Sequence, residues 1–217
     1  MTADLFGDDI WAPGQVTPLG EQALVLRGFA LPYVDALWPA LQAVLAQAPF
    51  RHMVTPGGQR MSVPLTNCGA LGWNSDRHGY RYTAIDPDSG RPWPGLPEPF
   101  ARLATEAAQA AGFVGYTPDA CLVNRYRPGT RLTLHQDRNE RDFAHPIVSV
   151  SLGVPATFLW GGDQRGDRAL RVSLHHGDVA VWGGVDRLRF HGVAPVQQAT
   201  HPLTGEERIN FTFRRAG

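Results

Sequence analysis

The sequence predicts a mostly β fold of the α+β type, a double-sheet jelly roll preceded by helices. The chain has 24 glycines and 18 prolines among its 217 residues, a composition that favours short strands and turns over long helices. About eight short apolar segments follow one another after residue 113, with glycine-rich turns between them. A chain that is 43% hydrophobic and 18% charged can form one domain with a sizeable core. We therefore expect a single globular domain over residues 1–217.

The N-terminal part, residues 1–49, contains a strand and a helix. Residues 23–26 are apolar and β-prone, and apolar residues recur on one helical face from Tyr33 to Ala48. Pro39 lies inside this pattern and is expected to kink or restart the helix. A second helix, a scaffold element over residues 98–112, is predicted from Glu98 onward and ends at Gly112.

Residues 50–97 have a different composition, rich in proline, glycine and large aromatic residues. There are too many turn signals here for a regular core element and too many aromatics for a disordered linker. An ordered lid of loops and short strands is therefore expected. Aromatic faces interleaved with arginines suit stacking on bases and pairing with phosphates. The alternative, that Trp73, Tyr80 and Tyr82 only pin loops to the core, stays open.

The remaining residues, 113–217, are expected to form the jelly-roll core. Its predicted strands are 120–126, 131–135, 146–152, 156–160, 169–174, 178–182, 188–191 and 207–214.

Two H-x-D pairs could contribute metal ligands, and only one follows a regular strand. The period of two along residues 131–137 directs His135 and Asp137 to the same face. In the second pair, Gly177 indicates a tight turn, where Asp178 is expected to bond backbone amides instead. Two such ligands and a distant histidine form the 2-His-1-carboxylate site of Fe(II) oxygenases. His145, His175, His191 and His201 are candidates for the third ligand, and we choose His191, which ends a predicted strand before Gly192.

The C-terminal strand alternates between polar and apolar side chains. Its apolar residues would fill the core, while Arg208 and Arg214 would line the opposite, inner face together with Asn210. Two arginines inside a small barrel need anions to pair with. A dicarboxylate with one carboxylate at each end would satisfy both.

Charge and cysteine content restrict the environment of the protein. The net charge is zero, but all 20 basic residues are arginine, and several cluster within 51–82 and 125–141. These clusters could contact phosphate, or could simply reflect codon bias. Cys68 and Cys121 are far apart in the sequence and are expected to be buried free thiols. No targeting or membrane segment is evident, so we expect a soluble cytoplasmic protein with no membrane partner.

Collinear motifs throughout the chain resemble the AlkB family of oxidative DNA demethylases. In the lid segment the motifs are 53–58, 66–69, 71–73 and 79–80, and in the predicted core they are 124–126, 135–137, 146–153, 176–184, 191–192 and 208–214. They cover nearly the whole chain in the same order.

The resemblance implies a double-stranded β-helix with a nucleotide-recognition lid and a set of site residues. It implies Fe(II) ligands at His135, Asp137 and His191. It implies binding of 2-oxoglutarate by Asn124, Tyr126, Arg208, Asn210 and Arg214. It implies substrate contacts by Trp73, Tyr80, Arg81, Tyr82, Asn139 and Arg165, with Trp73 stacking on the damaged base.

The resemblance also implies the reaction. With O2 and 2-oxoglutarate, such an enzyme hydroxylates the N-methyl group of bases such as 1-methyladenine or 3-methylcytosine, releasing formaldehyde, succinate and CO2. The target would be single-stranded or flipped-base DNA, with RNA left open as a substrate, and the protein would act as a monomer.

Two positions depart from the family pattern. Asn139 stands where an acidic residue is expected to bind the exocyclic amine of the base, and Gln59 stands where an aromatic phosphate contact is expected. These departures concern substrate preference and leave the expected iron and 2-oxoglutarate sites intact. Two alternatives are kept: an oxygenase of the same chemistry acting on a protein or small molecule, and a non-catalytic jelly-roll binding module.

Overall fold

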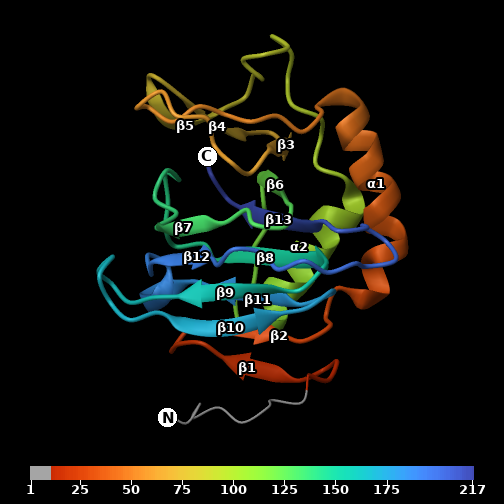
Figure 1. Ribbon diagram of the computed structural model, residues 1–217, viewed down its shortest axis with the longest axis vertical. Coiled ribbons are helices and arrows are strands. Elements are labelled where there is room, and N and C mark those ends of the chain that lie inside the picture. Colours follow the sequence, from red (N-terminus) through yellow and green to blue (C-terminus); the bar gives the residue numbers. More distant parts are fainter. Residues whose placement is uncertain (1–10) are drawn as a thin grey trace.

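Two antiparallel β-sheets face each other in the computed structural model, which describes residues 11–217 (Figure 1). The larger sheet has seven strands in the spatial order β1 (Val16–Pro18), β2 (Ala23–Leu26), β11 (Val179–Trp182), β8 (Ile147–Gly153), β13 (Arg208–Arg214), β6 (Ala120–Tyr126) and β3 (Leu65–Gly69). The smaller sheet has the order β10 (Leu170–Leu174), β9 (Ala156–Trp160), β12 (His191–Val193) and β7 (Leu132–His135). The predicted jelly roll is confirmed.

Two helices cover the outer face of the larger sheet (Figure 1). They are α1 (Val34–Gln47), preceded by the 3-10 turn η1 (Leu31–Tyr33), and α2 (Glu98–Ala110). The principal core lies between the helices and the sheet, where Leu37 and Leu41 of α1 and Phe100 and Leu103 of α2 are fully buried. As expected, α2 stops just before Gly112, whose positive φ of 91° lets Phe113 donate its N–H back to the helix at the carbonyl of Ala108.

Strand β13 separates the core from the space between the sheets. Ile209, Phe211 and Phe213 all belong to the core under the helices. Because strand side chains alternate, Arg208 and Arg214 point to the opposite face, into a cavity enclosed by the two sheets. The alternation predicted for this strand is therefore confirmed.

The lid segment, residues 50–97, forms a hairpin and also contributes one strand, β3, to the larger sheet. β4 (Gly72–Asp76) and β5 (Gly79–Thr83) pair only with each other, at the end of the molecule where β3 closes the larger sheet (Figure 1). β3 lies within the segment expected to be a lid, yet pairs with β6 over its full length. The segment is thus anchored by sheet hydrogen bonds on one side.

Two local predictions were wrong. Helix α1 does not restart at Pro39 but continues through it as one element, because the proline removes only its own N–H while the apolar face on both sides stays buried against the core. The strand predicted over 188–191 instead begins at His191. The preceding residues form the 3-10 turn η2 (Gly184–Asp186) and a bend, where Asp186 accepts a hydrogen bond from Arg189.

Gly192 lies where β12 approaches β7 most closely. The pairing of these strands shifts register between His191, opposite His135, and Val193, opposite Leu132. A Cβ at Gly192 would lie 2.6 Å from the carbonyl oxygen of Leu132. The glycine therefore permits the irregular pairing that brings the two histidines side by side.

Three further expectations concern Asp178, the cysteines and the membrane. Asp178 is fully buried, accepts the N–H of His175 across its turn and pairs with Arg27, as its predicted turn role requires. Cys68 and Cys121 are free, buried and opposite each other on β3 and β6. Within residues 11–217, none of the helices has the length and apolarity needed to span a bilayer.

Candidate active site

Three side chains in the cavity form a cluster that could hold a metal ion. His135 ends β7, Asp137 follows it by two residues, and His191 begins β12 beside it. Potential ligand atoms of the three lie within 4.8 Å of one another. Nε2 of His135 is 3.7 Å from Oδ1 of Asp137, and Nε2 of His191 is 3.7 Å from Oδ2. The predicted triad is therefore assembled, with its histidines on two neighbouring strands and its aspartate just after one of them.

Backbone hydrogen bonds determine which nitrogen each histidine offers. Nδ1 of His135 lies 2.9 Å from the carbonyl oxygen of Thr133, and Nδ1 of His191 lies 3.0 Å from that of Arg189. A carbonyl only accepts, so each Nδ1 carries a proton and Nε2 is the nitrogen that each ring can offer to a metal. Burial and the neighbouring His135 imidazole lower the pKa of His191 to about 3, which keeps this ring neutral. His191 is thus in the neutral form that binds a metal, and both rings direct Nε2 toward Asp137.

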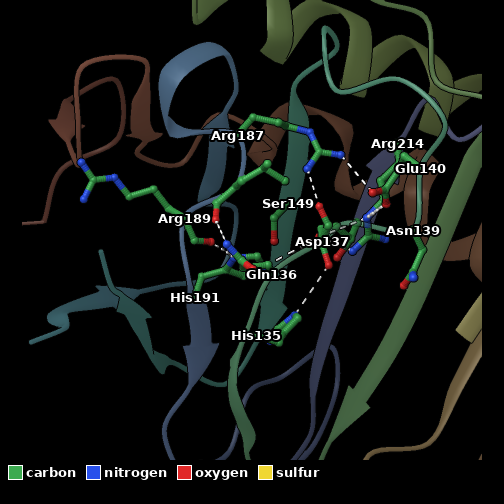
Figure 2. A network of polar contacts seen from close by, with 12 residues as sticks. His135, Gln136, Asp137, Asn139, Glu140, Ser149, Arg187, Arg189, His191 and Arg214 are labelled. Carbon is green, nitrogen blue, oxygen red and sulfur yellow. Dashed lines mark hydrogen bonds and ion pairs between the residues drawn. The ribbon is translucent and has the colours of Figure 1, made fainter. Parts of the chain in front are cut away.

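Asp137 is held ionised by Arg214. The guanidinium donates from Nε at 3.1 Å and from Nη2 at 2.5 Å to the same carboxylate oxygen, Oδ2 (Figure 2). Burial alone would raise the pKa of Asp137, but the Arg214 charge and its hydrogen bonds hold it well below its usual range. The carboxylate is therefore available as a ligand.

A buried ion-pair network behind Asp137 was missed at the sequence level. Glu140 is 6% exposed and lies 3.2 Å from Nε of Arg214 and 3.2 Å from Nη2 of Arg187. Arg187 also donates to the main-chain carbonyl of Asp137 at 2.8 Å (Figure 2). Glu140 and Arg187 lie in irregular segments without periodicity, so no pattern indicated that they are buried. The only available signal was an acidic residue within an arginine-rich loop.

Arg208 at the other end of β13 has no acidic partner within residues 11–217. It is 1% exposed, lies over the Tyr126 ring at 5.0 Å and donates from Nη2 to Ser151 at 2.9 Å. Its Nε and Nη1 have no hydrogen-bond partner. A buried guanidinium with two unpaired nitrogens fits one carboxylate of a bound dicarboxylate.

We expected neither Arg208 nor Arg214 to have an acidic partner within the protein. For Arg214 this expectation was wrong. Asp137 and Glu140, both in the segment after β7, lie within ion-pair distance of it. The polar residues between the two arginines, Asn124, Tyr126 and Asn210, line the cavity as predicted. Arg208 alone carries the argument for an anionic ligand.

Aromatic residues of the β4–β5 hairpin lie at the mouth of this cavity, whose volume is about 970 Å³. Trp73 stacks on Tyr80 with ring centroids 5.5 Å apart and planes 15° from parallel. Nε1 of Trp73 donates to Oδ1 of Asn139 at 3.2 Å, and the Tyr82 hydroxyl donates to Glu140 at 2.8 Å. The hairpin thus contacts the loop that follows the metal aspartate.

The two arginines proposed as substrate contacts differ in position. Arg165 lines the cavity, donates to the carbonyl oxygen of Leu134 at 2.5 Å and lies over the Phe190 ring. Arg81 does not line it, because alternation along β5 places it opposite Tyr80 and Tyr82. It pairs with Asp76 at 2.6 Å instead. Its proposed role in substrate binding has no support from this geometry.

The jelly roll and its His-Asp-His triad are those of a 2-oxoglutarate-dependent iron oxygenase, and comparisons with known proteins agree. A family model described as the 2OG-Fe(II) oxygenase superfamily matches residues 22–214. The alpha-ketoglutarate-dependent dioxygenase AlkB of Salmonella typhimurium is 54% identical over 98% of this chain and 97% of its own. AlkB of Escherichia coli is 51% identical over 99% and 98%. The chain therefore belongs to the AlkB family of 2OG-Fe(II) dioxygenases.

Structural and more distant comparisons agree. The solved structure of OsALKBH1 matches with a TM-score of 0.80 at 29% identity, covering 93% of this chain and 100% of that one. DNA N(6)-methyladenine demethylase ALKBH1C of Arabidopsis thaliana is 33% identical over 67% of this chain and 38% of its own. The tRNA demethylase abh1 of Schizosaccharomyces pombe is 29% identical over 67% and 52%. The chain is thus similar both to a relative named as a DNA demethylase and to one named as a tRNA demethylase.

Proposed function

We propose that this protein removes alkyl groups from N-alkylated bases in nucleic acid by oxidation that depends on Fe(II) and 2-oxoglutarate. One observation carries the proposal. A single cavity contains a His-Asp-His triad, the buried Arg208 guanidinium without an acidic partner among residues 11–217 and, at its mouth, the stacked pair Trp73 and Tyr80. The cavity therefore combines sites for a metal, a dicarboxylate and a planar substrate.

The triad fits Fe(II) by its donor set, two imidazole nitrogens and one carboxylate. Bound Fe(II) would supply O2 activation, coupled to conversion of 2-oxoglutarate to succinate and CO2, for hydroxylation of the alkyl group, which then leaves as formaldehyde when it is a methyl. The backbone carbonyls behind His135 and His191 hold both rings in orientation, and Arg214 keeps Asp137 charged.

Arg208 would bind the far carboxylate of 2-oxoglutarate through its unpaired Nε and Nη1. Asn124, Tyr126 and Asn210, between this arginine and the triad, would bind the rest of the molecule. Arg214 would lie beside the near carboxylate while still holding Asp137. These contacts would orient the cosubstrate relative to the metal.

The substrate would be a base stacked on Trp73, presented by single-stranded DNA or flipped from a duplex, with RNA as a further substrate. Residues 50–97 would form the nucleotide-recognition lid, with Tyr80, Tyr82, Asn139 and Arg165 around the base. All these residues come from one chain, so a monomer would suffice. A reducing cytoplasm would suit Fe(II) and the two free buried thiols.

The test is incubation with Fe(II), 2-oxoglutarate and O2 of oligonucleotides carrying 1-methyladenine or 3-methylcytosine, followed by mass spectrometry. We expect loss of one methyl group per lesion with equimolar formaldehyde and succinate. His135→Ala should abolish turnover, while His201→Ala, which changes a histidine outside both the cavity lining and residues 50–97, should not.

Other outcomes separate the alternatives. Turnover of 2-oxoglutarate with a protein or small molecule, but with no modified oligonucleotide, would replace the nucleic-acid proposal with a hydroxylase of another substrate class. Absence of any turnover in the metal-loaded protein would refute the enzyme proposal and leave a binding module.

A further inference from the structure

Gln136 lies between two residues of the triad, His135 and Asp137, and its side chain bonds to the segment that carries the third (Figure 2). Its Nε2 donates to the main-chain carbonyl oxygen of Leu188 at 2.6 Å. Leu188 belongs to the irregular segment between η2 and β12, and His191 begins β12. Since a carbonyl only accepts, the amide nitrogen of Gln136 must face Leu188. One side chain therefore connects the two parts of the triad.

The peptide unit between Leu188 and Arg189 is fixed at both of its ends. Its oxygen accepts the bond from Gln136, and its N–H, which belongs to Arg189, donates to the carbonyl oxygen of Asp186 at 3.1 Å. The Arg189 side chain also donates to the buried Asp186 carboxylate at 2.9 Å. Among residues 11–217, Gln136 provides the only hydrogen bond to the carbonyl oxygen of Leu188. Its removal would leave this peptide unit held only on the Arg189 side.

The rotation of this peptide unit affects His191. The next carbonyl along the chain, that of Arg189, lies 3.0 Å from Nδ1 of His191 and holds the ring with Nε2 toward Asp137. Peptide units are rigid planes joined at single Cα atoms, so a rotation of the Leu188–Arg189 unit changes the direction of the Arg189 carbonyl. Removing the partner behind a metal-binding histidine typically lowers metal affinity by about 10- to 100-fold. Gln136 can therefore influence a metal through the main chain.

A second bond joins the same two segments in the opposite direction. Nη1 of Arg187 donates to the main-chain carbonyl of Asp137 at 2.8 Å. Arg187 is buried and also pairs with Glu140, so its position does not depend on Gln136. The Gln136 side chain is half-buried and makes only the bond to the 188 carbonyl within the described part of the chain. Its loss should therefore move the segment before His191 and leave the network around Asp137 intact.

We propose, resting on the metal site of the proposed function, that Gln136 is a positioning residue: its hydrogen bond to Leu188 holds His191 in place relative to the other two residues of the triad. Gln136 acts through the main chain of residues 188 and 189. Its loss changes the geometry and the affinity of metal binding more than it changes the stability of the metal-free fold.

Gln136→Met tests this role, because it keeps the length and the neutrality of the side chain but removes the donor. Co(II) is the metal probe, since its visible d–d absorption reports the number and geometry of its ligands. We expect Gln136→Met to bind Co(II) about tenfold more weakly, as measured by competition with a chelator, and to show d–d bands of altered intensity. Gln47→Met is the matched control. It removes the same kind of bond, from Gln47 to the carbonyl of Ala43 at 3.1 Å on the exposed face of α1, and should leave both readouts unchanged.

A second variant separates the hydrogen bond from charge. Gln136→Glu also removes the donor, but it adds a negative charge that by itself would strengthen the binding of a cation. We therefore expect the two variants to differ in Co(II) affinity and to share the same change in the d–d spectrum. Urea unfolding of the metal-free proteins measures the contribution of Gln136 to the fold alone, and Gln136→Met should unfold at about the same urea concentration as Gln47→Met.

A native-like Co(II) spectrum in both Gln136 variants would overturn this inference, whether or not the variants are less stable, and would leave the proposed function standing. If the native protein binds Co(II) with this dependence on Gln136 but removes no alkyl group from any oligonucleotide, the proposed function fails and the positioning role of Gln136 stands.

Discussion

Nη2 of Arg214 lies 2.5 Å from Oδ2 of Asp137, so the carboxylate of the triad is paired with a guanidinium before any metal is considered. The pair is buried, with 7% and 10% of the side chains exposed. Removing one partner of such a pair leaves an uncompensated charge, whereas a divalent metal could replace the missing positive charge. The stability of the protein should therefore depend on metal binding once Arg214 is removed.

Arg214→Met tests this relationship. The variant leaves Asp137 and Glu140 without their shared cation and should reduce the metal-free unfolding free energy by about 3–5 kcal/mol. Co(II) should restore part of this loss, since the metal would neutralise Asp137. Urea unfolding with and without Co(II), followed by circular dichroism, measures both values. An equal loss with and without metal would contradict the proposed placement of the ion at Asp137.

Glu140 should affect metal affinity through its charge. Glu140→Gln keeps an acceptor for the Tyr82 hydroxyl but removes a negative charge close to the triad, and both arginines then act on Asp137 alone. We expect Co(II) to bind roughly tenfold more weakly, as measured by competition with a chelator. Tyr82→Phe is the matched control: it removes the hydroxyl, keeps both charges and should leave the affinity unchanged. Equal effects of the two changes would assign the role to packing.

Arg208 should lower the stability of the fold and increase the affinity of the protein for 2-oxoglutarate. Arg208→Met removes two buried, unpaired nitrogens, so the unfolding free energy should stay the same or increase. The same change removes the charge-assisted bonds proposed for the far carboxylate of 2-oxoglutarate and should raise its Kd about 100-fold. Titration calorimetry with Co(II)-loaded protein measures the Kd. Unchanged 2-oxoglutarate affinity would exclude Arg208 from the cosubstrate site.

Trp73 should contribute mainly to binding of nucleic acid. Trp73→Ala removes the stacking surface at the mouth while leaving the triad intact. Because stacking on an aromatic ring contributes about 1–3 kcal/mol per base, KM for a lesion-containing oligonucleotide should rise by about 5- to 150-fold with little change in kcat. Steady-state kinetics measure this change in KM. An unchanged Kd for 2-oxoglutarate would show that the effect is limited to binding of the oligonucleotide. A fall in kcat with constant KM would place Trp73 in the reaction step.

Much of the fold could be predicted because local patterns decide it. The alternation in β13 directs its arginines away from the core, and the apolar face of α2 ends where Gly112 permits the helix to stop. The boundary of β12 could not be predicted in this way. The start of β12 depends on the 3-10 turn before it. It also depends on the carbonyl oxygen of Leu132, because a Cβ at position 192 would clash with it.

The sequence by itself determined the jelly roll, the shared face of His135 and Asp137, and the family to which the chain belongs. Only the tertiary structure decided how the charges pair. Glu140, Arg187 and Arg214 meet around Asp137 because irregular loops fold back under the sheet, and Asn139 is oriented by a tryptophan 66 positions earlier in the chain. Hydrogen bonds and ion pairs between distant segments have no periodicity, so strand and helix patterns could not indicate them.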